Sequence, residues 1–411
     1  MSVNRRTFLS GAIAAGAAAA APTEAGREET LEMLDRVAAK PVFKKELFPD
    51  PVIIESVELL RHEDNFICRV RSAGGAEGHC VSNNYQMLYL YPISTERVNP
   101  FFIGKDARDL DGLIEGVYLH RNNYKLQNLA LWVPVATVEF AILDMMGKIA
   151  GKPMGALVGD VLHKKVAVYQ ANNHRGKSAE ESIELIKKTA SESMAKAVKF
   201  KIGGRMLAPD EPAGRTGRLI PLVREAFPEG YEIYADANGA YDAKEAIRIG
   251  RLLEEYKIDF FEGPVPFDWY EDIKTVADAL TIPLAGGGQE PSMRNYRWLI
   301  SHKAFQIVQP DMFYFGGMVR CMRATRMSAA MGLTCTPHVS GSGLGYLYMM
   351  HFVSATSNAG KFHEFKGLSP NVPFECPTSS LKSEDGVFTV PTGPGAGVTL
   401  DPDFVRKHVA V

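Results

Sequence analysis

The chain has 411 residues, of which 46% are hydrophobic, and its formal net charge is -2 at pH 7. This length and apolar fraction allow a large buried core, and they predict two or three domains or one barrel with a companion domain. The small net charge, with a pI of about 6.6, argues against a nucleic-acid-binding protein. The five cysteines lie far apart and form no disulfide framework or zinc pattern, so we expect mostly buried apolar thiols.

The first 25 residues have the pattern of an export signal. Arg5 and Arg6 precede Phe8 and Leu9, an alanine-rich apolar run and small residues that suit cleavage. This order resembles a twin-arginine signal, which predicts export of the folded protein to the periplasm. A frayed helix or a membrane anchor is the alternative, although the run is too short to span a bilayer comfortably. We expect no later segment to be apolar enough to span a membrane, so the mature protein should have no membrane partner. Residues 26–50 are expected to be a leader or linker.

Residues 51–164 are predicted to form a small α+β domain. Strands are expected at 52–60, 65–71 and 78–82, where apolar and β-branched residues are bounded by turn signals. Helices follow, and the clearest is expected at 134–149, before a Gly-Lys-Pro stop. The domain is therefore predicted to be a three-stranded meander followed by helices.

Residues 165–366 alternate short apolar runs with amphipathic segments. The expected strands are 166–170, 197–202, 232–235, 260–262, 283–285, 306–309, 334–336 and 362–365. Strands that alternate with helices predict a parallel sheet, and eight such units predict a closed (β/α)₈-type barrel. An open doubly wound sheet is the alternative, but no Gly-x-Gly-x-x-Gly sequence follows any of these strands. Residues 367–411 are expected to return to the first domain.

The second predicted barrel strand has two lysines on one face. Lys199 and Lys201 alternate with Val198, Phe200 and Ile202, because side chains alternate along a strand. The face is either solvated, at an edge of the sheet, or interior. If it is interior, each ammonium lowers the pKa of the other, and a lysine with a lowered pKa is a general base near neutral pH.

Polar side chains recur at the C-terminal ends of the other predicted strands, where such barrels have their active sites. In chain order they are Asp236, Glu262, Glu290 (within Gly-Gly-Gly-Gln-Glu), Asp311, His338 and Glu364. One carboxylate at a strand end is often a helix cap, but a set in successive units predicts a single cavity. The carboxylate oxygens of Asp236 and Glu262 suit Mg²⁺. They do not suit zinc, because no pair of histidines accompanies them. Asp311 would fix the tautomer of His338, and Glu364 would donate a proton or hydrogen bond if burial raised its pKa.

Over about residues 51–400 the chain resembles the enolase superfamily, specifically its mandelate racemase and muconate lactonizing enzyme-like group. The motifs that resemble it are Lys-x-Lys, Asp-x-Asn, Phe-Glu-Gly-Pro and Gln-Pro-Asp followed by Pro-His. The resemblance implies that the N-terminal domain caps the barrel, closes over the substrate and sets specificity. It also implies that Lys201 is the base on one face of the substrate, with Lys199 lowering its pKa and touching the substrate carboxylate.

The same resemblance assigns the other site residues. His338, supported by Asp311, would be the acid or base on the second face, and Glu364 would be the electrophile on the carboxylate. Asp236 and Glu262 would be Mg²⁺ ligands. The family's usual third acidic ligand is replaced by Gly288, so Glu290 reaches in instead, or water fills the position, or metal binding is weakened.

Two bases permit two reactions on a small carboxylate substrate. Abstraction of the α-proton followed by loss of a β-hydroxyl would dehydrate an acid sugar to a 2-keto-3-deoxy acid, and this is the prediction. Return of the proton from the other face would give a racemase or epimerase. A non-catalytic binding protein with a degenerate metal site is a third reading. Arg205, Arg215 and Arg218 lie in a loop that would contact a polyhydroxy acid or solvent. The family also implies a homo-oligomer.

Overall fold

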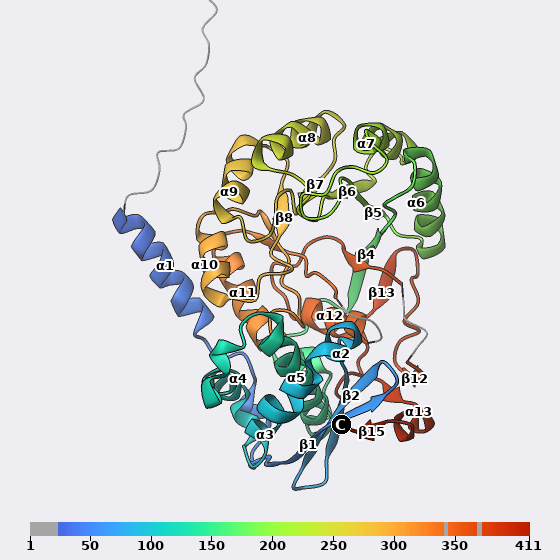
Figure 1. Cartoon of the computed structure of the whole chain (residues 1–411). Helices are drawn as coiled ribbons and strands as arrows, with labels where there is room; N and C mark the ends of the chain where they lie inside the picture. Colours follow the sequence, from blue (N-terminus) through green and yellow to red (C-terminus); the bar gives the residue numbers. More distant parts are fainter. Residues whose placement is uncertain (1–23, 341–343, 368–371) are drawn as a thin grey trace, which may run out of the picture.

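The computed structural model describes residues 24–340, 344–367 and 372–411. The export signal expected in residues 1–25 therefore lies, except for its last two residues, outside the described residues. Figure 1 shows an antiparallel sheet with helices at the bottom and a curled parallel sheet ringed by helices above it. The predicted mixed α/β class, with a barrel-type parallel sheet and a separate N-terminal sheet, is confirmed.

The N-terminal domain is built on a meander of three strands. β1 (Ile54–His62), β2 (Asn65–Ser72) and β3 (Glu77–Val81) pair in order, and β15 (Val409–Ala410) adds to the free edge of β1. Its helices are α2 (Asn84–Ile93), α3 (Asn99–Phe102), α4 (Leu110–Leu119) and α5 (Leu129–Ala150). Short 3₁₀ turns lie at Lys45–Leu47, Ala107–Asp109, His120–Lys125 and Met154–Leu157, and a π turn at Ser94–Val98. The last strand of the chain thus closes one edge of the first sheet.

Helix α5 begins five residues before the predicted start at Pro134, because Asn128 caps it through its side chain. The ring nitrogen of Pro134 has no hydrogen to donate, but residues 131–147 are all buried and tertiary packing maintains the helix across it. By length and composition α5 is the one helix in the described ranges that is apolar enough to cross a membrane. This corrects the expectation that no segment after the export signal would be apolar enough to span a membrane. Its burial identifies it as a core helix.

The parallel sheet has the strand order of a (β/α)₈ barrel. Its strands are β4 (Lys165–Ala171), β5 (Ala197–Lys201), β6 (Glu232–Asp236), β7 (Phe260–Glu262), β8 (Leu284–Gly286), β9 (Ile307–Val308), β10 (Thr334–Cys335) and β11 (His363–Phe365). Each of β4 to β9 pairs with the next, and β11 pairs with β4. Between β10 and the segment before β11 the described residues show one bridge, from Cys335 to Ala359, so the ring is nearly closed.

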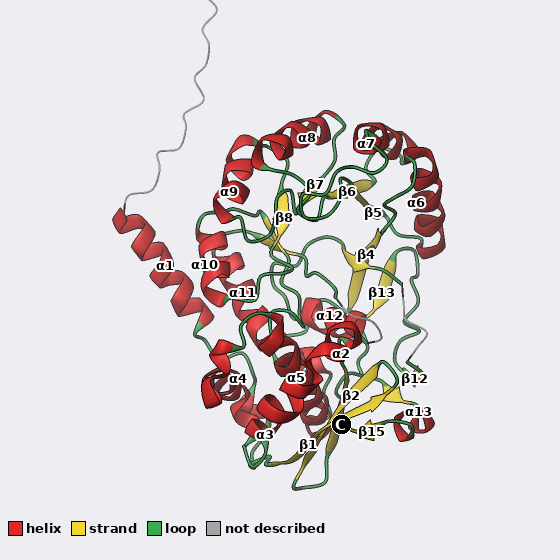
Figure 2. Ribbon diagram, in the orientation of Figure 1, coloured by secondary structure: helices red, strands yellow, loops and turns green. Residues whose placement is uncertain are grey.

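Helices surround this ring (Figure 2). They are α6 (Ala179–Ser193), α7 (Arg215–Ala226), α8 (Ala243–Glu255), α9 (Tyr270–Ala279), α10 (Met293–Ser301), α11 (Met318–Ala330) and α12 (Gly345–Ser354). After β11 the described chain has β12 (Phe374–Glu375), β13 (Val387–Thr389), β14 (Thr399–Leu400) and α13 (Pro402–Arg406) in place of an eighth barrel helix. The prediction of eight strand–helix units is therefore right for the strands and wrong for the last helix. α1 (Glu24–Ala38) lies against α10 and α11.

Candidate active site

A cavity of about 270 Å³ opens at the C-terminal ends of the barrel strands. Asp236, Glu262, Gln309 and His338 line it, together with the glycines that follow β8. The predicted clustering of strand-end side chains is therefore seen for Asp236, Glu262 and His338, since they come from three different strands or the segments just after them. The cavity is where a small molecule would meet both acidic and basic groups.

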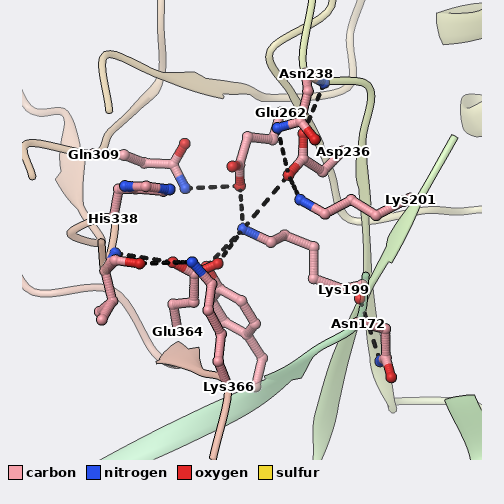
Figure 3. A network of polar contacts seen from close by, with 12 residues as sticks. Asn172, Lys199, Lys201, Asp236, Asn238, Glu262, Gln309, His338, Glu364 and Lys366 are labelled. Atoms are coloured by element: carbon pink, nitrogen blue, oxygen red, sulfur yellow. Dashed lines mark hydrogen bonds and ion pairs between the residues drawn. The ribbon is translucent and has the colours of Figure 1, made fainter. Parts of the chain in front are cut away.

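The lysine face of β5 is interior. Both lysines are buried, with Lys199 0% and Lys201 6% exposed. The ammonium of Lys201 donates to the Asp236 carboxylate, and that of Lys199 donates to Glu262 at 2.7 Å and to Glu364 at 2.8 Å (Figure 3). The exposed edge-strand reading is therefore wrong, because β5 lies between β4 and β6 in the sheet.

The two lysines differ in acidity. Burial and the charge of Lys199 lower the pKa of Lys201, and together they outweigh the contact with Asp236, which raises it. For Lys199, burial acts in the same direction, but the negative charges of Glu262 and Glu364 outweigh it and raise the pKa well above its ordinary value. Lys201 is therefore the lysine that can release a proton most readily, and Lys199 remains a fixed positive charge.

Asp236 and Glu262 supply the acidic ligands for a cation. They are direct partners in the register of β6 and β7, so their side chains leave the sheet at the same level. Magnesium sites in proteins often use one or two carboxylates and complete the shell with water and substrate oxygens. This donor set fits such a two-carboxylate site, in which the cation would share Asp236 with Lys201 and Glu262 with Lys199. In the described part of the chain no three His, Cys, Asp or Glu side chains are arranged to hold a metal.

Glu290 does not join these carboxylates. Its side chain accepts hydrogen bonds from the Tyr270 hydroxyl, the Ser292 backbone N–H and Asn295, and it lines a different cavity of about 660 Å³. The hypothesis that Glu290 is the third metal ligand is contradicted by this position. The physical reason is the turn at Gly287, where φ is 95°, after which the chain directs Glu290 away from the barrel mouth toward α9 and α10.

The predicted pair of Asp311 and His338 forms as expected. His338 Nδ1 lies 2.8 Å from Asp311 Oδ2. The other oxygen of Asp311 accepts hydrogen bonds from the backbone N–H groups of Phe313 and Tyr314, both at 2.9 Å, and from the Ser340 hydroxyl at 2.7 Å. Asp311 is an acceptor on every side, so His338 carries the Nδ1 proton and presents Nε2 as the free nitrogen.

Glu364 is buried, but its pKa is not raised and it is not a protonated carboxylic acid. Burial alone would raise its pKa, but the positive charges of Lys199 and Lys366 outweigh it and hold the pKa well below its usual range. Its Oε2 also accepts the backbone N–H of Val339 at 2.9 Å. The expectation that burial would let Glu364 donate a proton is therefore wrong for the arrangement described: the group is an ion-paired carboxylate.

Comparison with known proteins then places the chain. The family model described as "Enolase C-terminal domain-like" matches residues 181–404, which is more than half of the chain. The chain belongs to this family. Among curated proteins it is 25% identical to arabinonate dehydratase of Saccharolobus solfataricus over 341 residues, covering 82% of this chain and 89% of that one. It is 24% identical to D-xylonate dehydratase of Haloferax volcanii, covering 76% and 78%.

Solved structures agree with this placement in the enolase-like family. A protein of Roseobacter denitrificans, described provisionally as a racemase, superimposes with a TM-score of 0.80 at 29% identity, over 87% of this chain and 99% of that one. A mandelate racemase/muconate lactonizing protein of Paracoccus denitrificans, complexed with magnesium, superimposes with a TM-score of 0.77 at 23% identity, over 88% and 99%. The second likeness shows the fold.

The structure adds residues to this enolase-like site that the sequence did not single out. Gln309 donates to Glu262 at 3.0 Å, and Lys366 lies 3.3 Å from Glu364. Arg175 donates to Asn238 at 2.8 Å and to the backbone oxygens of Ile202, Gly203 and Asp236. Their positions depend on contacts between strands, and the only sequence signal was that each lies within a few residues of a strand end.

Of the three arginines expected in a loop after β5, only Arg205 lies in the loop, because Arg215 and Arg218 lie at the start of α7. Arg205 lines the cavity, as a contact with substrate requires. Arg215 is buried and donates to the backbone oxygen of Lys201 at 2.8 Å and to that of His174 at 2.5 Å, so it shapes the strand end. Arg218 is exposed and pairs with Glu180. Only the first of the three has access to a ligand in this cavity.

Proposed function

We propose that this chain abstracts the proton α to the carboxylate of an acid sugar and eliminates the β-hydroxyl, giving a 2-keto-3-deoxy acid. The observation that supports it is the arrangement of two bases about one acidic cluster. Lys201 lies on one side of Asp236 and Glu262, and His338 lies on the other (Figure 3). A carbon acid bound between them would face a base on each side.

The roles follow from the contacts. Lys201, with its lowered pKa, takes the α-proton on one face. His338, held by Asp311 at 2.8 Å, presents Nε2 to the other face, and in its imidazolium form it donates the Nε2 proton that the leaving hydroxyl needs. Lys199 is a fixed positive charge and would contact the substrate carboxylate. Since both lysines are buried, water competes little for these contacts.

We propose Mg²⁺ as the cofactor, held by Asp236 and Glu262 with water and substrate oxygens in the remaining positions. When bound, the cation supplies positive charge that stabilises the enediolate formed by proton removal. Support comes from the donor set and from the Mg²⁺-bound structural relative. Calorimetric titration of the folded protein with Mg²⁺ tests it, and Asp236→Asn should weaken the binding.

Two of the curated relatives favour dehydration over the isomerase alternative, whereas a third, the D-galactarolactone cycloisomerase of Agrobacterium fabrum, at 26% identity, favours an isomerase. The arabinonate and D-xylonate dehydratases span most of this chain, and both names describe acid-sugar dehydration. The racemase-type neighbour, at 29% identity, favours epimerisation, for which the same two bases suffice. Incubation of a panel of aldonic acids in D₂O distinguishes them. A dehydratase forms a 2-keto-3-deoxy acid, whereas an epimerase returns substrate deuterated at Cα in both configurations.

We also propose that the folded enzyme is exported through a twin-arginine signal in residues 1–25 and functions in the periplasm as a homo-oligomer. The support is the Arg5-Arg6-x-Phe8-Leu9 pattern for export and the family resemblance for assembly. Fractionation of cells that produce the full chain, compared with an Arg5→Lys, Arg6→Lys variant, tests export. Sedimentation of the purified protein tests assembly.

A further inference from the structure

A chain of buried hydrogen bonds runs from the capping domain to the catalytic histidine. Asn83 lies in the connection between β3 and α2, in the N-terminal domain, and its Nδ2 donates to Ser340 Oγ at 3.1 Å. Ser340 Oγ donates to Asp311 Oδ1 at 2.7 Å, and Asp311 Oδ2 accepts from His338 Nδ1 at 2.8 Å. Asn83 and Asp311 are 1% exposed and Ser340 is 8% exposed. The chain therefore crosses the domain boundary out of contact with bulk water.

The direction of every hydrogen bond in this chain is determined. Asn83 caps α2, and its side-chain oxygen accepts from the backbone N–H of Gln86, so its amide nitrogen must face Ser340. The Asp311 carboxylate has no proton to give, so the Ser340 hydroxyl must donate to it. The Ser340 oxygen is then free to accept from Asn83. Turning the Asn83 amide over would set its NH₂ group against the Gln86 N–H, so that two donors would face each other.

We propose that Asn83 and Ser340 are positioning residues, through which the first turn of α2 in the capping domain orients the Asp311–His338 pair for proton transfer. Neither residue lines the cavity, so they act on the reaction through the pair. A second contact supports the same link, since Gln86 Nε2 donates to the Tyr314 hydroxyl at 3.5 Å and the Tyr314 ring lies 6.3 Å from that of His338. As a consequence, the His338 ring is oriented for proton transfer only when the capping domain is packed against the barrel. The inference rests on the proposed function of His338.

The chain offers matched variants. Ser340→Ala removes the hydroxyl that donates to Asp311. Asn83→Asp keeps the oxygen that caps α2 but removes the amide donor and offers the Ser340 hydroxyl a competing acceptor. Asn84→Ala is the control, because Asn84 is also buried but bonds to Phe66 and Asn65 within its own domain, at 2.9 Å each. The control thus weakens the capping domain without touching the chain that leads to His338.

The test is NMR of the full-length protein with isotope-labelled histidine, without substrate. The Nδ1 proton of His338 is assigned by its loss in His338→Asn. Ser340→Ala and Asn83→Asp are expected to shift or broaden that signal, and Asn84→Ala to leave it unchanged. The proposal is overturned if the signal is unchanged in both, if it changes only in Ser340→Ala, or if the control changes it equally. None of these outcomes requires turnover, so a failed proposed function would not be mistaken for a failed link.

With a substrate in hand, the same variants give a kinetic readout. Ser340→Ala should lower kcat by roughly tenfold, on the scale of losing a hydrogen bond to a charged group, and Asn83→Asp should lower kcat through the same hydroxyl. KM should stay unchanged, because neither side chain lines the cavity. A rise in KM at constant kcat would contradict a role in proton transfer and overturn the proposal.

Discussion

Gly288 determines how closely the segment after β8 can approach His338. A Cβ atom built at Gly288 would lie 3.0 Å from both Cβ and Cγ of His338. Since non-bonded carbon atoms prefer separations of about 3.5–4.0 Å, the imidazole would have to move by roughly 0.5–1 Å. Asp311 holds this ring by a hydrogen bond of 2.8 Å, which such a movement would lengthen. The glycine therefore gives His338 its space and offers no side chain to the cation proposed at Asp236 and Glu262.

We expect Gly288→Ala to slow the His338 step by roughly tenfold to a hundredfold, because a misplacement of about 1 Å costs on the order of a hundredfold in rate. Overpacking would also cost about 1–3 kcal/mol of stability if the backbone cannot yield. Gly217→Ala in α7 is the matched control, since a Cβ there meets no atom within 4 Å. An alanine at that helical position should stabilise the protein by about 0.5–1 kcal/mol.

The assay measures Cα hydrogen–deuterium exchange by NMR for substrate epimers that present the proton to His338 or to Lys201, with thermal unfolding midpoints alongside. We expect Gly288→Ala to slow exchange mainly at the His338 face. If the variant exchanges at both faces as fast as Gly217→Ala does, the close contact between Gly288 and His338 does not control the ring position. The same geometry predicts that Gly288→Glu would not add a third ligand without disturbing His338.

Burial raises the pKa of Glu139 to about 8. Between about pH 5 and 8 the folded protein therefore keeps a proton on Glu139 that the unfolded chain releases. The free energy of unfolding should fall by about 3–4 kcal/mol as the pH rises over this range. Glu139→Gln should abolish that fall in thermal midpoint, and a variant with the same pH dependence would refute the assignment. Lys366→Met should reduce turnover while leaving Mg²⁺ affinity unchanged, because Lys366 lies 3.3 Å from Glu364 and outside the acidic pair; calorimetry that shows weakened Mg²⁺ binding would contradict this. Arg175→Lys should loosen the loop after β6 and raise KM. The Arg175 guanidinium joins Asn238 to the backbone oxygens of Ile202, Gly203 and Asp236, and one ammonium cannot make all of these contacts. An unchanged KM would show that these contacts are dispensable for substrate binding.

The features that the sequence predicted are those set by local periodicity. Lys199 and Lys201 were expected on one face because strand side chains alternate, and both are buried on that face. Asp236, Glu262 and His338 were expected at one cavity because parallel strands end at one rim, and all three line it. These inferences need only strand identity and direction, both of which the sequence pattern specifies.

The features that the sequence did not predict depend on contacts between distant segments. Asn83 and Ser340 are 257 positions apart, and nothing in either neighbourhood indicates the other. Glu290 is only two residues beyond Gly288, but a single turn at Gly287 decides which cavity it faces. The charge state of Glu364 depends on Lys366 as well as on Lys199. Periodicity places a residue on an element, but its partners are set by packing.

The most direct test of the central claim is exchange of the α-proton in D₂O with Mg²⁺, using a panel of aldonic acids and the unaltered protein beside Lys201→Met and His338→Asn. The account predicts that one acid forms a 2-keto-3-deoxy product with deuterium incorporated, and that neither variant forms the product. In the partial reaction, each variant should lose exchange at a different face of Cα. Exchange at neither face by the unaltered protein, with Mg²⁺ bound and the whole panel tried, would contradict α-proton abstraction as the function of this site.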